Sequence, residues 1–202
     1  MDIQSEDKII IFNCDDHFYQ YINKAIDEKD INEEKVIKVL REYTNQKYIQ
    51  MNGYLRKGDY FMDSQSGIAS IFLLGLPMII YLDNLASIKS LYLGLQDKIY
   101  IKDLIDVKEG TVVYRGVKTK PPSSWKVGYQ FYFAEFVSTS LDINKAKEFG
   151  QYIFVIKLYG KGFKGVEKLS YYPSEKEILI NAYSKFKITK ISGKYYYMDR
   201  LH

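Results

Sequence analysis

The chain has 202 residues, of which 47% are hydrophobic and 27% charged, a composition typical of one well-packed globular domain rather than a disordered chain. Its net charge of +4 is spread along the sequence without a long run of like charges, which gives little support to a nucleic-acid-binding function. A single cysteine, Cys14, excludes an internal disulfide framework, and two histidines, His17 and His202, make a histidine-based metal site improbable, so no metal ligand set is expected.

The N-terminal thirty residues are polar and acidic at their start, without the cationic and apolar regions of a secretory signal. The most apolar window lies at residues 68–82 and is interrupted by Gly75 and Pro77. This window is too short to span a bilayer, and a buried helix followed by a turn explains it better. A membrane-associating role for the window stays open as an alternative.

The first half of the chain predicts helices. Asn32 is a suitable N-cap, and Glu33 and Glu34 follow it in the first turn, where the helix dipole favours negative charge. The apolar residues of the segment 36–40 then recur on one side of the predicted helix. A second helix is predicted over residues 48–57 and is expected to end at Gly58.

The second half is rich in Val, Tyr, Phe and Ile in short runs separated by Gly and Pro, which predicts strands. The runs cover residues 111–115, 129–137, 152–159, 177–181 and 185–191, with a short helix over 144–149 after an Asp142 cap. Helices first and strands second favour an α+β fold with a mixed or antiparallel sheet. We expect one domain over residues 1–202, mostly helical over 1–107 and β-rich over 108–202.

Three short segments of the β-rich half carry candidate functional residues. Arg115 and Gly116 end an apolar strand, where an arginine can hold a phosphate or ribose with two hydrogen bonds and a glycine lets a ligand approach the backbone. A surface salt bridge is the simpler explanation of this arginine on its own. Ser138 and Ser140 are predicted to lie on one face of the next strand, with Thr139 on the other, and could brace a neighbouring carboxylate, although polar strand ends are common.

The third segment contains two glutamates, Glu175 and Glu177, two residues apart at the start of an apolar strand. The period of a strand places their side chains on the same side, with Lys176 on the other. Two carboxylates this close repel each other unless a cation lies between them, so the pair suggests a functional site. A solvated strand end is the alternative.

In the order arginine, Ser-x-Ser and Glu-x-Glu, these segments resemble the arginine–serine–glutamate signature of the ADP-ribosyltransferase family. The similarity is to the branch shared by vertebrate ecto-enzymes and clostridial binary actin-modifying toxins. It extends from about residue 33 to residue 191. Residues 41–44 and 53–56 resemble the helical region that precedes the catalytic core in the family. The resemblance implies a helical region packed on a β-sandwich core that binds NAD, which corresponds to residues 108–202 here.

For NAD, the resemblance implies that Arg115 lies near a phosphate and the nicotinamide ribose, and that the Gly116 backbone meets the nicotinamide amide. Ser138 would brace the catalytic carboxylate, and Phe149 would stack near the nicotinamide. One departure is that Gly150 and the two residues after it stand where the toxin branch often has a phosphate-binding basic residue.

For the reaction, the resemblance implies that Glu177 is the catalytic residue, which bonds a ribose hydroxyl and stabilises the oxocarbenium ion as nicotinamide leaves. Glu175 would receive the guanidinium of the acceptor, and Tyr172 would help to recognise the target. The implied activity is transfer of ADP-ribose from NAD to arginine of a target protein, with NAD as co-substrate and no metal. The alternatives are an NAD glycohydrolase, or a catalytically silent module that binds NAD or a partner.

The expected partner is a target protein with an exposed arginine, without nucleic acid and without stable membrane insertion. We expect a monomer located in the cytoplasm, or a secreted effector without a conventional signal peptide, because the vertebrate enzymes' disulfides and signal are missing from this sequence.

Overall fold

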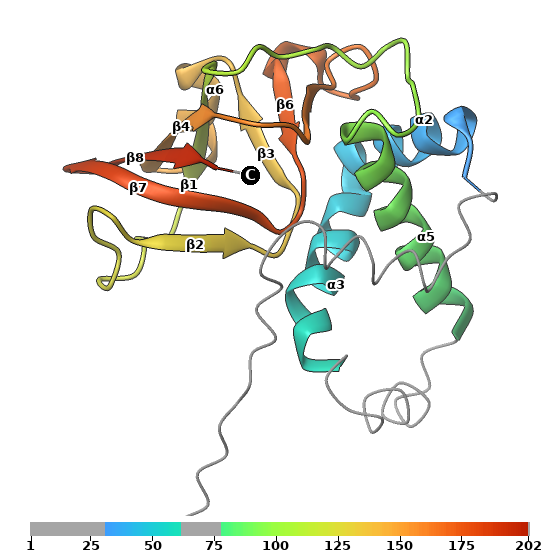
Figure 1. Cartoon of the computed structure of the whole chain (residues 1–202), viewed down its shortest axis with the longest axis horizontal. Helices are drawn as coiled ribbons and strands as arrows, with labels where there is room; N and C mark the ends of the chain where they lie inside the picture. The colour runs from blue at the N-terminus through green and yellow to red at the C-terminus, as the bar shows by residue number, and fades with distance from the viewer. Residues whose placement is uncertain (1–30, 62–77, 202) are drawn as a thin grey trace, which may run out of the picture.

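The computed structural model describes residues 31–61 and 78–201 and shows a group of helices beside a curved β-sheet (Figure 1). The helices are α2 (Glu33–Glu42), a π-helical turn η2 (Tyr43–Lys47), α3 (Tyr48–Phe61) and α5 (Met78–Leu95). A further helix, α6 (Ile143–Phe149), packs on the sheet against β1. The predicted α+β class, a helical region beside a mixed sheet, is therefore confirmed.

The start of α2 agrees with the sequence prediction, because the Asn32 side chain accepts a hydrogen bond from the Lys35 amide at 2.9 Å. The predicted end of α3 at Gly58 is wrong, since the helix continues to Phe61. A glycine inside a helix is only about 1 kcal/mol less favourable than alanine, so it does not by itself stop a helix.

The sheet has eight strands in the order β2-β7-β8-β4-β1-β3-β6-β5. Their bounds are β1 Val112–Val117, β2 Gln130–Phe133, β3 Val137–Ser140, β4 Tyr152–Leu158, β5 Phe163–Gly165, β6 Glu177–Ile180, β7 Ser184–Ser192 and β8 Tyr195–Arg200. The β4–β8 pair is parallel and the other pairs are antiparallel, so the sheet is mixed.

The sheet differs from the prediction in two respects. The run 129–137, predicted as one strand, divides into β2, which pairs with β7 at one edge, and β3, which lies between β1 and β6. The strands β5 and β8 were not predicted. In β8 the residues Tyr195, Tyr196 and Tyr197 alternate between half-buried and buried positions, but three identical residues show no alternation in a sequence.

Two hydrophobic clusters hold the domain together. One lies within the sheet, and the other packs α2, α3 and α5 against Phe136, which directly precedes β3, and against Leu179 of β6. The Asn52 side chain of α3 joins the halves further, because it accepts from the Phe136 amide at 3.2 Å and donates to the Phe136 carbonyl at 3.3 Å. The helical region is thus fixed against the segment between β2 and β3.

Residues 1–30, 62–77 and 202, with Cys14 and both histidines, lie outside the described residues. The apolar window 68–82 is described only from Met78 onward, where it forms the start of α5. Among the described helices, none is long and apolar enough to cross a membrane.

Candidate active site

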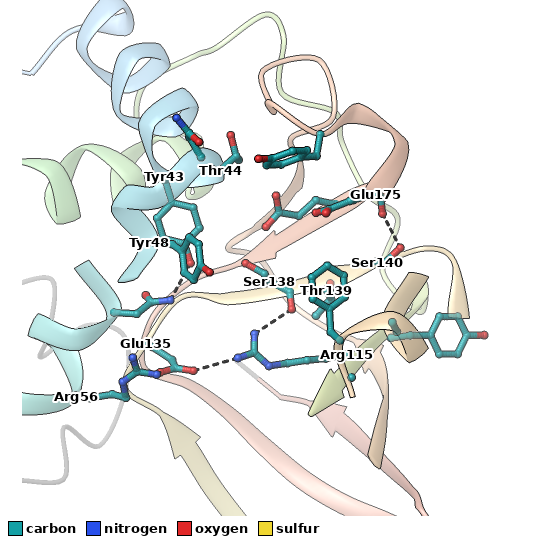
Figure 2. Close-up of a pocket in the computed structure, with 18 residues that line it drawn as sticks. Tyr43, Thr44, Tyr48, Arg56, Arg115, Glu135, Ser138, Thr139, Ser140 and Glu175 are labelled. Atoms are coloured by element: carbon teal, nitrogen blue, oxygen red, sulfur yellow. Dashed lines mark hydrogen bonds and ion pairs between the residues drawn. The ribbon is translucent and has the colours of Figure 1, made fainter. Parts of the chain in front are cut away.

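A cavity of about 470 Å³ lies where the helical region meets β1, β3 and the start of β6 (Figure 2). The seven residues that the family resemblance assigns to the site all line it: Arg115, Gly116, Ser138, Phe149, Tyr172, Glu175 and Glu177. They come from separate strands, a turn and a helix, so only the fold brings them together.

Glu177 is the buried acid of the cavity, with 7% of its surface exposed, at the first position of β6 opposite Ser140 of β3. Burial raises the pKa of the Glu177 carboxyl from 4.5 to about 7, and the negative charge of Glu175 adds to this. A hydrogen bond with Ser138 and the positive charge of Arg115 lower the pKa again, less strongly than burial raises it. The carboxyl therefore titrates near neutral pH.

The hydroxyl groups of β3 have different partners. Ser138 bonds the Glu177 carboxyl, whereas Thr139 donates to the Ile178 carbonyl at 2.7 Å. Ser140 donates to the backbone carbonyl of Glu175 at 2.6 Å. The strand thus holds one glutamate by its side chain and the other by its backbone.

The sequence pattern predicted Glu175 at the start of the strand, but Glu175 lies before β6. It ends a 3-10 turn, η3 (Pro173–Glu175), and Lys176 takes the left-handed conformation with φ of 47° before β6 begins. The alternation rule therefore does not apply between the two glutamates, yet both line the cavity. Burial raises the pKa of Glu175, with Lys145 acting in the opposite direction and Glu148 adding to the rise.

Arg115 is held in place on the cavity side of β1. Its Nη1 donates to the Ser138 carbonyl at 3.0 Å, and its Nη2 lies 3.2 Å from Oε1 of Glu135. Its side chain is 23% exposed, so this ion pair lies inside the cavity wall and is not the simple surface salt bridge that the sequence left open.

Phe149 and Tyr172 lie at the rim of the cavity, each about half exposed at 50% and 51%. Tyr171, which directly precedes Tyr172, is 60% exposed, and its amide donates to the Thr44 hydroxyl at 3.2 Å. The π-helical turn that carries Thr44 thus contacts the loop that carries Tyr172, and π-helical turns are frequent at functional sites.

The sequence did not predict that the helical region contributes side chains to the cavity wall. It indicated only that residues 41–44 and 53–56 resemble the helices that precede the catalytic core in the family. Tyr48, Asn52 and Arg56 all line the cavity and recur every four residues along α3. Residues four apart lie on one face of a helix, so this spacing was a readable signal. The sequence pattern also does not predict Glu135 as a site residue, because it predicts a continuous strand over 129–137, whereas Glu135 lies in the bend between β2 and β3.

Tyr43, from the π-helical turn, lines the cavity and is almost completely buried. Its hydroxyl accepts from Asn52 Nδ2 at 3.0 Å, and burial, with a contribution from the charge of Glu177, raises its pKa. The hydroxyl therefore stays neutral beside the buried glutamate.

Gly116 lines the cavity and also has a structural role in packing α6 on β1. A Cβ at this position would lie 1.8 Å from the carbonyl oxygen of Ala146 and 3.0 Å from the Gly150 amide. Since that side of Gly116 is filled by the end of α6, the glycine allows the helix to pack directly on β1.

We expect Gly116→Ala to lower the free energy of unfolding by about 3 kcal/mol, because the new methyl group must displace helix backbone. Gly53→Ala in α3 is the matched control: a Cβ there meets nothing within 4 Å. Its helix propensity should add about 1 kcal/mol of stability. Urea unfolding of the two variants checks both signs, and unchanged stability of Gly116→Ala would contradict the packing argument.

Within residues 31–61 and 78–201, no group of three or more His, Cys, Asp or Glu side chains could hold a metal ion.

The family model of NAD:arginine ADP-ribosyltransferases matches residues 91–199, which include the strands and α6 that build most of the cavity. The match covers more than half of the sequence, and the chain belongs to this family. Membership supports transfer of ADP-ribose as the reaction and NAD as its co-substrate. No curated protein matches the chain significantly by sequence.

Several bacterial ADP-ribosyltransferases of known structure share the fold. The Vis toxin of Vibrio splendidus is 19% identical, with a TM-score of 0.57 over 92% of this chain and 81% of Vis. Exoenzyme S of Pseudomonas aeruginosa, solved with human 14-3-3 protein beta and carba-NAD, is 16% identical, with a TM-score of 0.57 over 92% and 84%. Plx2a of Paenibacillus larvae is 18% identical, with a TM-score of 0.58 over 94% and 98%.

Proposed function

We propose that this protein transfers a single ADP-ribose from NAD to an arginine side chain of a target protein. The observation that carries the proposal is the meeting of Glu177, Glu175 and Arg115 in one cavity, although they come from β6, a turn and β1. One carboxylate serves the breaking bond, the other serves the acceptor, and the arginine holds the donor.

In the proposed reaction, the bond between C1′ of the ribose and the nicotinamide nitrogen breaks, and both of its electrons leave with nicotinamide. The leaving group is neutral, so it needs no general acid. The ribose becomes an oxocarbenium ion, and the ionised Glu177 carboxylate, which bonds a ribose hydroxyl, stabilises that positive charge. A guanidine nitrogen then forms a new bond to C1′.

The acceptor is proposed to be a guanidinium group that Glu175 binds, orients and helps to deprotonate, since a protonated guanidinium is a poor nucleophile. The place of Glu175 at the mouth, beside the half-exposed Tyr172, suits a group that arrives on another protein. The Vis enzyme, which shares the fold at 20% identity, has been solved with agmatine, a small guanidinium compound.

NAD is proposed to bind with its diphosphate and nicotinamide ribose near Arg115, its amide at the Gly116 backbone and its ring near Phe149. Ser138 supports this arrangement through its hydrogen bond with the Glu177 carboxyl. The 202 residues are proposed to form a single transferase domain that acts as a monomer, in the cytoplasm or as a secreted effector.

Purified protein incubated with labelled NAD, with and without agmatine, tests the proposal. Transfer of label to agmatine supports it. Release of nicotinamide without transfer would identify an NAD glycohydrolase instead. Absence of both, with NAD still bound in calorimetry, would identify a silent binding module.

The pH dependence should follow Glu177, whose pKa is raised to about 7 by burial. Only the ionised carboxylate stabilises the oxocarbenium ion, so kcat/KM for NAD should rise with pH, with a midpoint near 7, and fall about tenfold per unit below it. In kcat the midpoint should be lower, because the cationic nicotinamide ring of bound NAD favours the carboxylate. A profile of kcat/KM that is flat from pH 5.5 to 8 would contradict this assignment.

A further inference from the structure

Glu135 is a buried carboxylate between two arginines, on the side of the cavity away from Glu175 (Figure 2). Its Oε2 lies 2.5 Å from Nη1 of Arg56, which comes from α3, and its Oε1 lies 3.2 Å from Nη2 of Arg115, which comes from β1. The Glu135 side chain is 9% exposed, whereas that of Arg56 is 57% exposed. Each oxygen of one carboxylate is therefore paired with an arginine from a different half of the domain.

Glu135 is one of two groups that fix the plane of the Arg115 guanidinium. The other is the Ser138 carbonyl, which accepts from Nη1 at 3.0 Å. Two hydrogen bonds to different nitrogens determine the orientation of a planar guanidinium, and they use two of its five N–H donors. The side chain of Arg115 thus already has a defined direction before any ligand binds.

The position of Glu135 is itself held by its neighbours in the chain. The next residue, Phe136, is buried and exchanges two backbone hydrogen bonds with the Asn52 side chain. Ala134, the residue before, packs against the cluster formed by the helical region. The carboxylate is therefore attached to a rigid part of the cavity wall.

We propose that Glu135 is a positioning residue for NAD, which holds Arg115 in the orientation that receives the dinucleotide. The inference rests on the proposed function, in which Arg115 contacts NAD. Glu135 itself does not need to touch the dinucleotide. Because Arg56 neutralises the second oxygen, the carboxylate can remain buried beside an anion-binding arginine.

Positioning and simple electrostatics predict opposite effects of removing the Glu135 charge. NAD carries a negatively charged diphosphate, so loss of a negative charge from the cavity would by Coulomb attraction alone tighten its binding. Loss of the positioning contact would release Arg115 and Arg56, which then repel each other, and would weaken binding. The sign of the change therefore separates the two explanations.

The test is the affinity of the full chain for NAD, measured by calorimetry, together with kcat/KM for NAD cleavage. For Glu135→Gln we expect the dissociation constant for NAD to rise about tenfold, since a small displacement of a binding group weakens binding strongly. Glu109→Gln is the matched control, because it makes the same charge change at an exposed residue that accepts from Gly160 and does not line the cavity. Its affinity should be unchanged, and equal or tighter binding by Glu135→Gln would overturn the inference.

Glu135→Asp gives a second test without a change of charge. The shorter side chain should not reach both arginines, so the dissociation constant should again rise about tenfold. Wild-type affinity in this variant would also overturn the inference.

Arg115→Lys separates failure of this inference from failure of the proposed function. If Arg115→Lys binds NAD as tightly as wild type, the role of Arg115 in the proposed function is wrong. If Arg115→Lys binds weakly and the Glu135 variants bind normally, only the positioning role is wrong. If Glu135 acts through Arg115, Glu135→Gln should weaken NAD binding much less in the Arg115→Lys background.

Discussion

Glu177→Gln is expected to lower the rate of NAD cleavage by about 100- to 1000-fold, the usual effect of removing one preorganised group that faces charge developing in the transition state. The amide has nearly the same shape as the carboxyl group but carries no negative charge for the oxocarbenium ion. NAD should still bind, because Arg115 and the rest of the cavity are unchanged. Nicotinamide release from labelled NAD at pH 8 measures the effect, and a loss of less than tenfold would contradict the catalytic role.

The same variant should be more stable than wild type at pH 8. The pKa of Glu177 is about 7 in the folded protein and about 4.5 when exposed, so the folded state favours the protonated form. The stability from this group is fully present below pH 4.5 and is lost as pH rises to 7. Since 2.5 pKa units correspond to about 3 kcal/mol, Glu177→Gln should gain up to that amount at pH 8 and almost nothing at pH 4.5. Urea unfolding at the two pH values would show whether the buried Glu177 carboxylate lowers the stability of the fold.

Glu175→Gln is expected to separate transfer from cleavage. Transfer to agmatine should fall about 100-fold or more, because an amide binds a guanidinium weakly and cannot take its proton. Hydrolysis of NAD without agmatine should stay within about threefold of wild type, because Glu177 still stabilises the oxocarbenium ion and water replaces the guanidine. Parallel assays of labelled agmatine and of released nicotinamide measure the ratio.

Glu148→Gln is the matched control for Glu175→Gln. Glu148 pairs with Lys145 on α6 and contributes to the raised pKa of Glu175, but it does not line the cavity. Its removal changes the local charge by the same amount and should leave both assays close to wild type. If both variants lose transfer equally, general charge near the mouth explains the effect, and the specific role of Glu175 is wrong.

Much of the fold was predictable from the sequence because short-range effects determine it. The Asn32 cap requires only a side chain that reaches an amide three residues later, and β1, β4, β6 and β7 each lie within or across a run of β-forming residues. Local rules failed where several effects compete. They predicted the end of α3 at Gly58, which lies inside the helix. They also predicted one strand over 129–137, where β2 ends and β3 begins at another place in the sheet.

The sequence by itself determined which residues could carry the chemistry, because the order of arginine, serines and glutamates is a property of the chain. Only the tertiary structure decided what surrounds them. Burial raises the pKa of Glu177, and a turn, not strand alternation, brings Glu175 to the same cavity. Glu135 acquires its two arginines from segments 79 and 20 residues away. Burial and contacts between distant segments depend on how the whole chain packs, and local residue spacing does not contain that information.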